Sequence, residues 1–170
     1  MKPMLTLEKE PTTKMKTIAT KAFGTIDIDD DAMYEFPEGL YGFTDETQFA
    51  LLDKNADSPF LWLQSMKDEH LAFILIDPKL LIGDYVPKVP QADLSAVDVS
   101  SVNDCIVYSI VTIPQNAPEE MTINLQGPVI FNKSKQLGAQ VISDDDSHGV
   151  RVPVLKLMEA NSAHSGAKAE

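Results

Sequence analysis

The residues with the most chemical potential lie in one stretch near the carboxyl end. Three consecutive aspartates, Asp144 to Asp146, precede His148 and Arg151. A histidine beside carboxylates is an arrangement that general acid–base catalysis uses, so an unrecognised hydrolase is one hypothesis for this segment. None of the chain's three histidines is spaced from another as zinc ligands are. We therefore favour a solvated loop histidine over a catalytic or metal role for His148.

Other signatures of chemistry are missing from the sequence. A second acidic run, Asp29 to Asp31, lacks the alternating ligands and distal glutamate of an EF-hand loop. The candidate nucleophiles Ser58, Ser65 and Ser109 lie in strand-like runs without a nucleophile elbow, and no glycine-rich phosphate loop is present. Cys105, the one cysteine, lies in an apolar run and is expected to be a buried small hydrophobe. We expect no cofactor and no metal, and the pattern favours binding over catalysis.

The charge of the chain indicates what it can bind. Its 26 acidic and 14 basic residues give a formal net charge of −12, and nearly all of it lies away from the two ends. Such a surface cannot neutralise a row of phosphates, so direct binding to nucleic acid is not expected. It also repels anionic membranes. Solubility alone and attraction to a basic protein partner are both compatible with this charge.

Short apolar runs separated by turn residues predict the fold. Phe60–Leu63 and Leu71–Ile76 read as a hairpin, and neither run alternates cleanly, so both faces of each strand should be covered. Proline and glycine at Phe36–Gly39 suit a type I turn. Gln91 to Val97 is the best helix candidate. We predict an all-β fold: a small antiparallel β-barrel-like domain of about ten short strands with one or two short helices.

Both ends lack apolar patterning. We expect residues 1–14 to be a mobile extension, residues 15–154 to form the barrel domain and residues 155–170 to be a mobile tail. No run approaches the ~18 apolar residues that span a membrane, and the start of the chain has no secretory signal. Together with the single cysteine, this predicts a cytoplasmic protein.

Several strings of residues resemble a known family. The strings are Phe36-Pro-Glu-Gly-Leu-x-Gly-Phe43, Ser58-Pro-Phe-x-Trp-Leu-Gln-Ser65, Leu71-Ala-Phe-Ile-x-x-Asp-Pro78, Val111-Thr-Ile-Pro114, Met121-Thr-x-Asn-Leu-x-x-Pro-x-x-x-Asn132 and Gln140-Val-Ile142. They occur in the order and at the spacing found in the flagellar assembly factor FliW family, and the resemblance runs from about Lys16 to Val154. The ending His148-Gly-Val-Arg-Val-Pro153 departs from the family pattern, which leaves the role of His148 open.

The resemblance implies a function without catalysis. Members of this family bind CsrA, a small RNA-binding regulator, and allosterically stop it from repressing translation of flagellin messenger RNA. Flagellin is their competing partner, so that accumulated flagellin frees the regulator. The alternative is an export chaperone or assembly protein that binds flagellin and has no effect on CsrA.

Candidate contact residues come from two groups. Polar positions within the strings and the late loop are poor core residues, and each could instead make a structural hydrogen bond at a turn or strand end. Aspartates of the acidic loops are candidates for electrostatic steering of a basic partner. Phe36, Phe43, Trp62 and Phe73 are expected in the core. The first group is Glu38, Asp77, Asn124, Asn132 and Arg151, and the second is Asp29, Asp30, Asp144 and Asp145.

Overall fold

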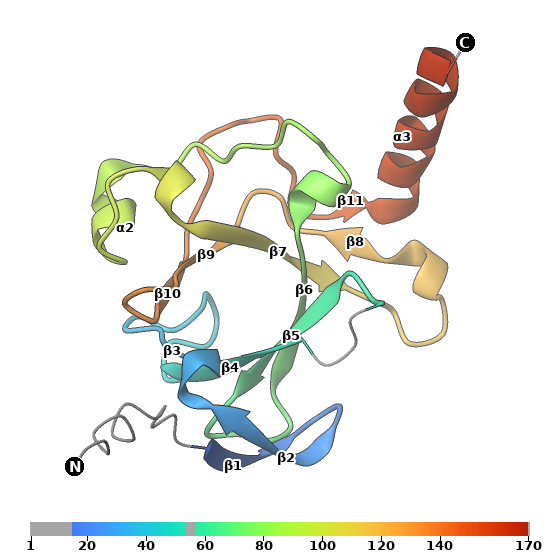
Figure 1. Ribbon diagram of the computed structural model, residues 1–170. Coiled ribbons are helices and arrows are strands. Elements are labelled where there is room, and N and C mark those ends of the chain that lie inside the picture. The colour runs from blue at the N-terminus through green and yellow to red at the C-terminus, as the bar shows by residue number, and fades with distance from the viewer. Residues whose placement is uncertain (1–14, 54–56, 170) are drawn as a thin grey trace, which may run out of the picture.

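The computed structural model describes residues 15–53 and 57–169, with side chains to residue 161. Strands dominate these residues, and short 3-10 helices (η) occupy several of the turns (Figure 1). In order, the elements are β1 Met15–Thr20, β2 Gly24–Asp29, η1 Asp30–Ala32, β3 Met33–Glu35, β4 Gln48–Leu52, β5 Phe60–Ser65, β6 Ala72–Ile76, η2 Pro78–Leu80, α2 Gln91–Ser95, η3 Val102–Asp104, β7 Ile106–Thr112, η4 Pro118–Glu120, β8 Thr122–Ile123, β9 Val129–Asn132, β10 Leu137–Gln140, β11 Val152–Pro153 and α3 Val154–Ala169.

Seven strands close into a barrel. They follow the order β7-β6-β5-β4-β3-β10-β9, and β9 pairs with β7 to complete the ring that Figure 1 shows. β8 and β11 extend the sheet from β7. The predicted fold class is confirmed, including the hairpin of β5 and β6. One pairing differs from the expected antiparallel pattern: β3 and β10 run parallel, and the long chain between them provides the crossover that parallel strands need.

The two faces of the central strands are covered by different parts of the chain. Leu63 and Phe49 point into the barrel, where they belong to the aromatic core. On the other face, Trp62 packs with Ile18 and Ile28 of the β1–β2 ribbon. The prediction that both faces are covered is therefore confirmed, and it explains why the apolar runs do not alternate.

An aromatic cluster fills the barrel. The ring of Phe36, fully buried, meets those of Phe49 and Phe131 edge to face, at centroid distances of 5.1 Å and 5.7 Å. Each such pair contributes about 0.5–1.5 kcal/mol beyond its burial. Of the aromatics expected in the core, Phe36 is buried, and Trp62 and Phe73 are half-buried. Phe43 was wrongly placed there, because it lies on the outer side of a turn and keeps 39% of its surface exposed.

The carboxyl end forms a helix that the sequence analysis did not predict. α3 leaves the barrel directly after β11 and projects from it (Figure 1). Its first turns hold to the barrel through buried Val154 and through Asn161, whose amide donates to the Leu81 carbonyl at 2.8 Å. Leucine, lysine, methionine and alanine favour helix without any amphipathic pattern, which is why patterning alone missed it. Mobility of this segment stays a prediction, and residues 1–14 lie outside the described part of the chain. None of the helices in the described residues is long and apolar enough to cross a membrane.

Candidate partner-binding surface

A slot beside strand β10 is where two of the family-like strings meet. It has a volume of about 540 Å³ and lies between β10, the loop after β3, and α2. This is within the ~300–1,000 Å³ range of ligand pockets in proteins. We call it the β10 slot, and its lining residues are Pro37, Glu38, Gly39, Leu40, Tyr41, Thr44, Asp93, Ala96, Gly138, Ala139, Gln140 and Val141.

The loop after β3 forms one wall because the chain turns sharply there. The Gly39 N–H donates to the Phe36 carbonyl at 2.8 Å, which closes the predicted turn over Phe36–Gly39. Gly39 has a φ of +64°, and a Cβ there would overlap the backbone of Phe43 and Thr44. Only glycine fits this position without strain. Proline and glycine together carry the chain away from the barrel immediately after β3.

Strand β10 forms the other wall and, among the residues that the structure describes, lacks a neighbour along part of its length. On one side it pairs with β9 over all four of its residues. On the other side it pairs with β3 at a single position, Leu137 with Glu35. Beyond that pair the edge from Gly138 to Gln140 faces the slot. The turn at Pro37 is the cause, since a longer β3 would have covered this edge.

A side chain fixes the width of the slot. Gln140 Oε1 accepts the Tyr41 N–H at 3.0 Å, and its Nε2 donates to the Gly127 carbonyl at 2.9 Å. The loop is thereby tied to β10 through a side chain instead of through the backbone. Tyr41 keeps 59% of its surface exposed, so an aromatic ring stands at the rim of a rigid wall. Such rings are frequent anchors of protein interfaces.

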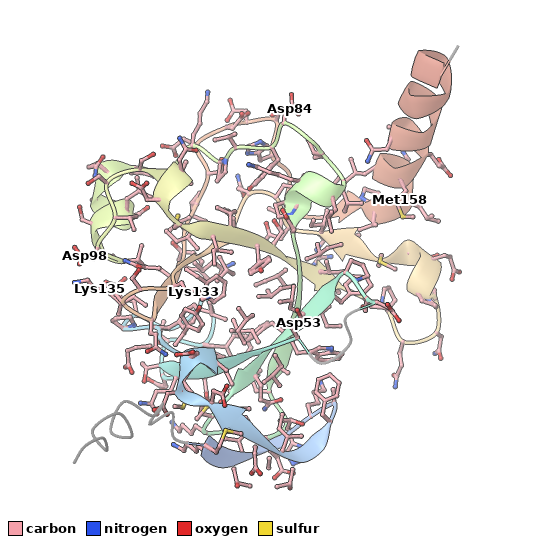
Figure 2. The ribbon with its side chains drawn as sticks, in the orientation of Figure 1. Asp53, Asp84, Asp98, Lys133, Lys135 and Met158 are labelled. Carbon is pink, nitrogen blue, oxygen red and sulfur yellow. The ribbon has the colours of Figure 1, made fainter. Side chains whose placement is uncertain are left out.

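The slot is acidic. Glu38 and Asp93 line it, and no basic residue does so among those that the structure describes. The two lysines just before β10 belong elsewhere. Lys135 pairs with Asp98, Nζ to Oδ2 at 3.1 Å (Figure 2), and Lys133 lines a separate cavity at the mouth of the barrel. Because carboxylates attract cations across a concave surface, the slot favours a positively charged occupant.

Three of the other candidate residues make structural hydrogen bonds. Asp77 Oδ1 accepts the Lys79 N–H at 3.0 Å and caps η2. Asn124 Oδ1 accepts the N–H groups of Gln126 and Gly127 at 3.1 Å and 2.8 Å. Asn132, buried, donates to the Val97 carbonyl at 2.7 Å. The sequence analysis gave such hydrogen bonds at turns and strand ends as the alternative to a partner contact. A contact of these residues with a partner stays a prediction.

The steering candidates lie on different parts of the surface. Asp29 and Asp30 flank the start of η1, whereas Asp144 and Asp145 lie in the loop after β10, and the structure does not bring the two pairs together in one site. Asp145 accepts hydrogen bonds from the hydroxyl and N–H of Ser147, which lower the pKa of its carboxyl. Arg151 is exposed and forms no ion pair with another described residue.

His148 is not the solvated loop residue that the sequence analysis favoured. Its side chain is 11% exposed, and its ring lies 4.6 Å from that of Tyr85. Nδ1 lies 2.9 Å from Ser143 Oγ, and Nε2 lies 3.7 Å from Asp145 Oδ2. The order serine–histidine–aspartate resembles a catalytic triad. Ser143, however, is buried and its oxygen accepts the Lys88 N–H at 3.0 Å. The group therefore fastens the loop after β10 to the segment before α2.

The remaining candidates for chemistry lie apart from the slot. Within the described residues, no three histidine, cysteine or acidic side chains gather as metal ligands would. Cys105 is half-buried, and burial raises the pKa of its thiol to about 11. Sequence reasoning singled out Glu38 but missed Tyr41 and Asp93. Tyr41 occupies the variable position of its string, and Asp93 carries no signal in the sequence, because only the fold brings α2 to the slot.

The comparisons with known proteins match this chain over the whole barrel. The model of the FliW protein family matches residues 16–154. The chain belongs to the FliW family. The flagellar assembly factor FliW of Leptospira biflexa is 44% identical over 147 residues, which are 86% of this chain and 96% of that protein. That of Treponema denticola is 38% identical over 143 residues, with 84% and 96% covered.

A solved structure agrees with the fold. The crystal structure of a flagellar assembly factor FliW superposes with a TM-score of 0.74 at 32% identity and covers 82% of this chain and 96% of that one. The FliW family match ends at residue 154, where α3 begins. The β10 slot therefore lies within the part of the chain that the family model matches, whereas α3 follows that part.

Proposed function

We propose that this chain acts in flagellar assembly as an antagonist of the RNA-binding regulator CsrA, with flagellin as the competing partner. Membership of the FliW family is the observation that carries the proposal. In this proposal the protein works in the cytoplasm, holds CsrA away from flagellin messenger RNA, and releases it when flagellin accumulates. Two partners that exclude each other need either overlapping surface or two coupled states of the protein.

The charge of the chain supports a basic partner. A protein that binds RNA presents lysines and arginines, and a chain with a net charge of −12 is steered toward such a surface. The rigid loop with exposed Tyr41 supports protein binding as the activity, since a preformed surface loses little entropy when a partner docks.

Titration with both partners tests the proposal. The protein is mixed with CsrA in a calorimeter at low salt, and the release of flagellin messenger RNA from CsrA is followed by gel shift. We expect a salt-sensitive complex that frees the RNA, and we expect flagellin to dissociate it. Binding to flagellin without binding to CsrA would instead support the export-chaperone alternative, and no association with CsrA at low salt would refute the proposed antagonism.

A further inference from the structure

The free edge of β10 is a place where another chain can pair. Unpaired N–H and C=O groups on a strand edge are a template for an added strand. Ala139 turns its backbone groups to β9, and the Gly138 N–H takes part in the pairing with Glu35, so the edge offers the carbonyl of Gly138 and both backbone groups of Gln140. At about 3.3 Å per residue, Gly138 to Gln140 span roughly 10 Å of backbone beside the slot. That length pairs with about three residues of an extended peptide.

The walls of the slot select the occupant. Leu40, Ala139 and Val141 provide apolar surface, and Glu38 and Asp93 provide negative charge with no basic residue among the described lining. The exposed ring of Tyr41 at the rim suits a cation, since ammonium and guanidinium groups stack on aromatic faces. An extended segment with alternating apolar and basic side chains fits both the backbone edge and the charge.

Other strand ends are less suited to this role. β11 ends in Pro153, which has no N–H to donate. β1 carries exposed Lys16, which repels a basic segment. β2 lies beside the barrel-mouth cavity, and Lys133 is part of that lining. The β10 slot combines a strand edge and a cavity with purely acidic charge.

We propose that the β10 slot binds an extended, basic peptide segment of a partner protein, which adds to β10 as a strand where β3 has turned away and places a lysine or arginine between Glu38 and Asp93. The inference goes beyond the proposed function, because it assigns a mode of peptide capture and does not require CsrA or flagellin to supply the segment.

Nuclear magnetic resonance titration with defined peptides tests the inference. The probe is acetyl-Thr-Val-Lys-Val-Thr-amide, added to the full chain labelled with nitrogen-15 at low salt. We expect saturable shifts of the amide signals of Gly138, Ala139 and Gln140. The same peptide with glutamate in place of lysine should bind at least fivefold more weakly. A peptide methylated on its internal backbone nitrogens should lose at least tenfold in affinity, because it cannot donate to β10.

Variants of the protein separate charge from shape. Glu38→Gln and Asp93→Asn should each raise the Kd two- to fivefold, whereas Glu119→Gln, on exposed η4, should leave it unchanged. Ala96→Leu should fill the slot and raise the Kd at least tenfold. Its control is Ser95→Leu, the exposed neighbouring residue that does not line the slot.

Several outcomes would overturn the inference. They are shifts confined to β2, equal binding of the methylated peptide, and slot signals that move when the protein alone is diluted, which would mean that a second copy fills the slot. None of these results depends on CsrA. The peptide titration can therefore refute binding at the β10 slot while the titration with CsrA and flagellin still supports the proposed antagonism, and the reverse is also possible.

Discussion

The backbone N–H of Tyr41 donates to the side-chain oxygen of Gln140 at 3.0 Å, across 99 positions of the chain. This bond joins the turn after β3 to the end of β10, and the second half of the same amide group holds the Gly127 carbonyl. One side chain therefore fixes both the width of the slot and the position of the exposed Tyr41 ring.

Replacing this glutamine should loosen the slot. In Gln140→Leu, the Tyr41 N–H and the Gly127 carbonyl lose their partner, and we expect the free energy of unfolding to fall by about 1–3 kcal/mol. Urea denaturation followed by fluorescence measures it. Gln115→Leu, at an exposed loop position, should change it by less than about 0.5 kcal/mol. Equal effects of the two changes would contradict the bridging role.

Gly138 should not tolerate a side chain. A Cβ at this position would overlap the buried ring of Phe36, whose neighbours leave it no room to move. We expect Gly138→Ala to lower the free energy of unfolding by about 1–3 kcal/mol through overpacking. Gly83→Ala is the matched control, because nothing lies within 4 Å of a Cβ there. Adding Phe36→Leu to Gly138→Ala should recover part of the loss, and strict additivity of the two changes would rule out the proposed clash.

Gln64 should be needed for the central hairpin. Its side chain, 1% exposed, accepts the Lys21 N–H at 2.9 Å through Oε1, and its Nε2 lies 3.2 Å from the carbonyls of Asp68 and Leu71 at the β5–β6 turn. We expect Gln64→Ala to cost about 1–3 kcal/mol of unfolding free energy, because these buried groups lose their partner. Gln48→Ala serves as the control in the same urea series, because Gln48 is exposed and its side chain makes a long hydrogen bond of 3.4 Å to Glu35. This change should alter the free energy of unfolding by less than about 0.5 kcal/mol.

The hairpin and the slot differ in how far the sequence predicts them. Apolar runs and turn residues are local signals, so β5, β6 and the turn at Gly39 could be read directly. The parallel pairing of Leu137 with Glu35 could not, because no turn sets its register and the two residues lie far apart in the chain. The free edge of β10 follows from that pairing. For this reason the sequence pointed to Glu38 without showing what it faces.

The errors in the sequence reading have physical causes as well. Phe43 looked like a core residue because aromatic content does not show on which side of a turn a ring will lie. It rests against Phe73, at a centroid distance of 5.3 Å, while its outer face meets solvent. His148 looked solvated because its neighbours in the sequence are acidic. The ring of Tyr85, from a distant segment, and the hydroxyl of Ser143, five residues earlier, bury it instead.

The Cys105 thiol should react slowly. Burial, with a smaller contribution from the charge of Asp104, raises its pKa to about 11. Since the thiolate is the nucleophile, alkylation by iodoacetamide at pH 8 should be roughly a hundredfold slower than for an exposed cysteine. The rate should rise as the pH approaches 11. Burial favours the neutral thiol, so the folded state is stabilised relative to the thiolate form. This stabilisation is complete below the pKa that the Cys105 thiol has in the unfolded chain, and it is lost as the pH rises through about 11. An alkylation rate equal to that in urea would show that the thiol is accessible.

Reversing charge in the acidic loops should slow the encounter with a basic partner. Asp29 and Asp144 are exposed and lie in different loops, so Asp29→Lys and Asp144→Lys change the field of the protein at two places without removing a side-chain hydrogen bond to another described residue. Asp145 is unsuitable, because its carboxylate holds Ser147. In stopped-flow binding to CsrA at low salt, we expect the double variant to lower the association rate constant at least fivefold and to change the dissociation rate constant by less than twofold. At 1 M salt, where the screening length is about 3 Å, the difference from the unmodified chain should vanish.

An association rate that does not respond to charge reversal would exclude steering by these loops, whereas a changed dissociation rate would place one of the two aspartates in the contact itself.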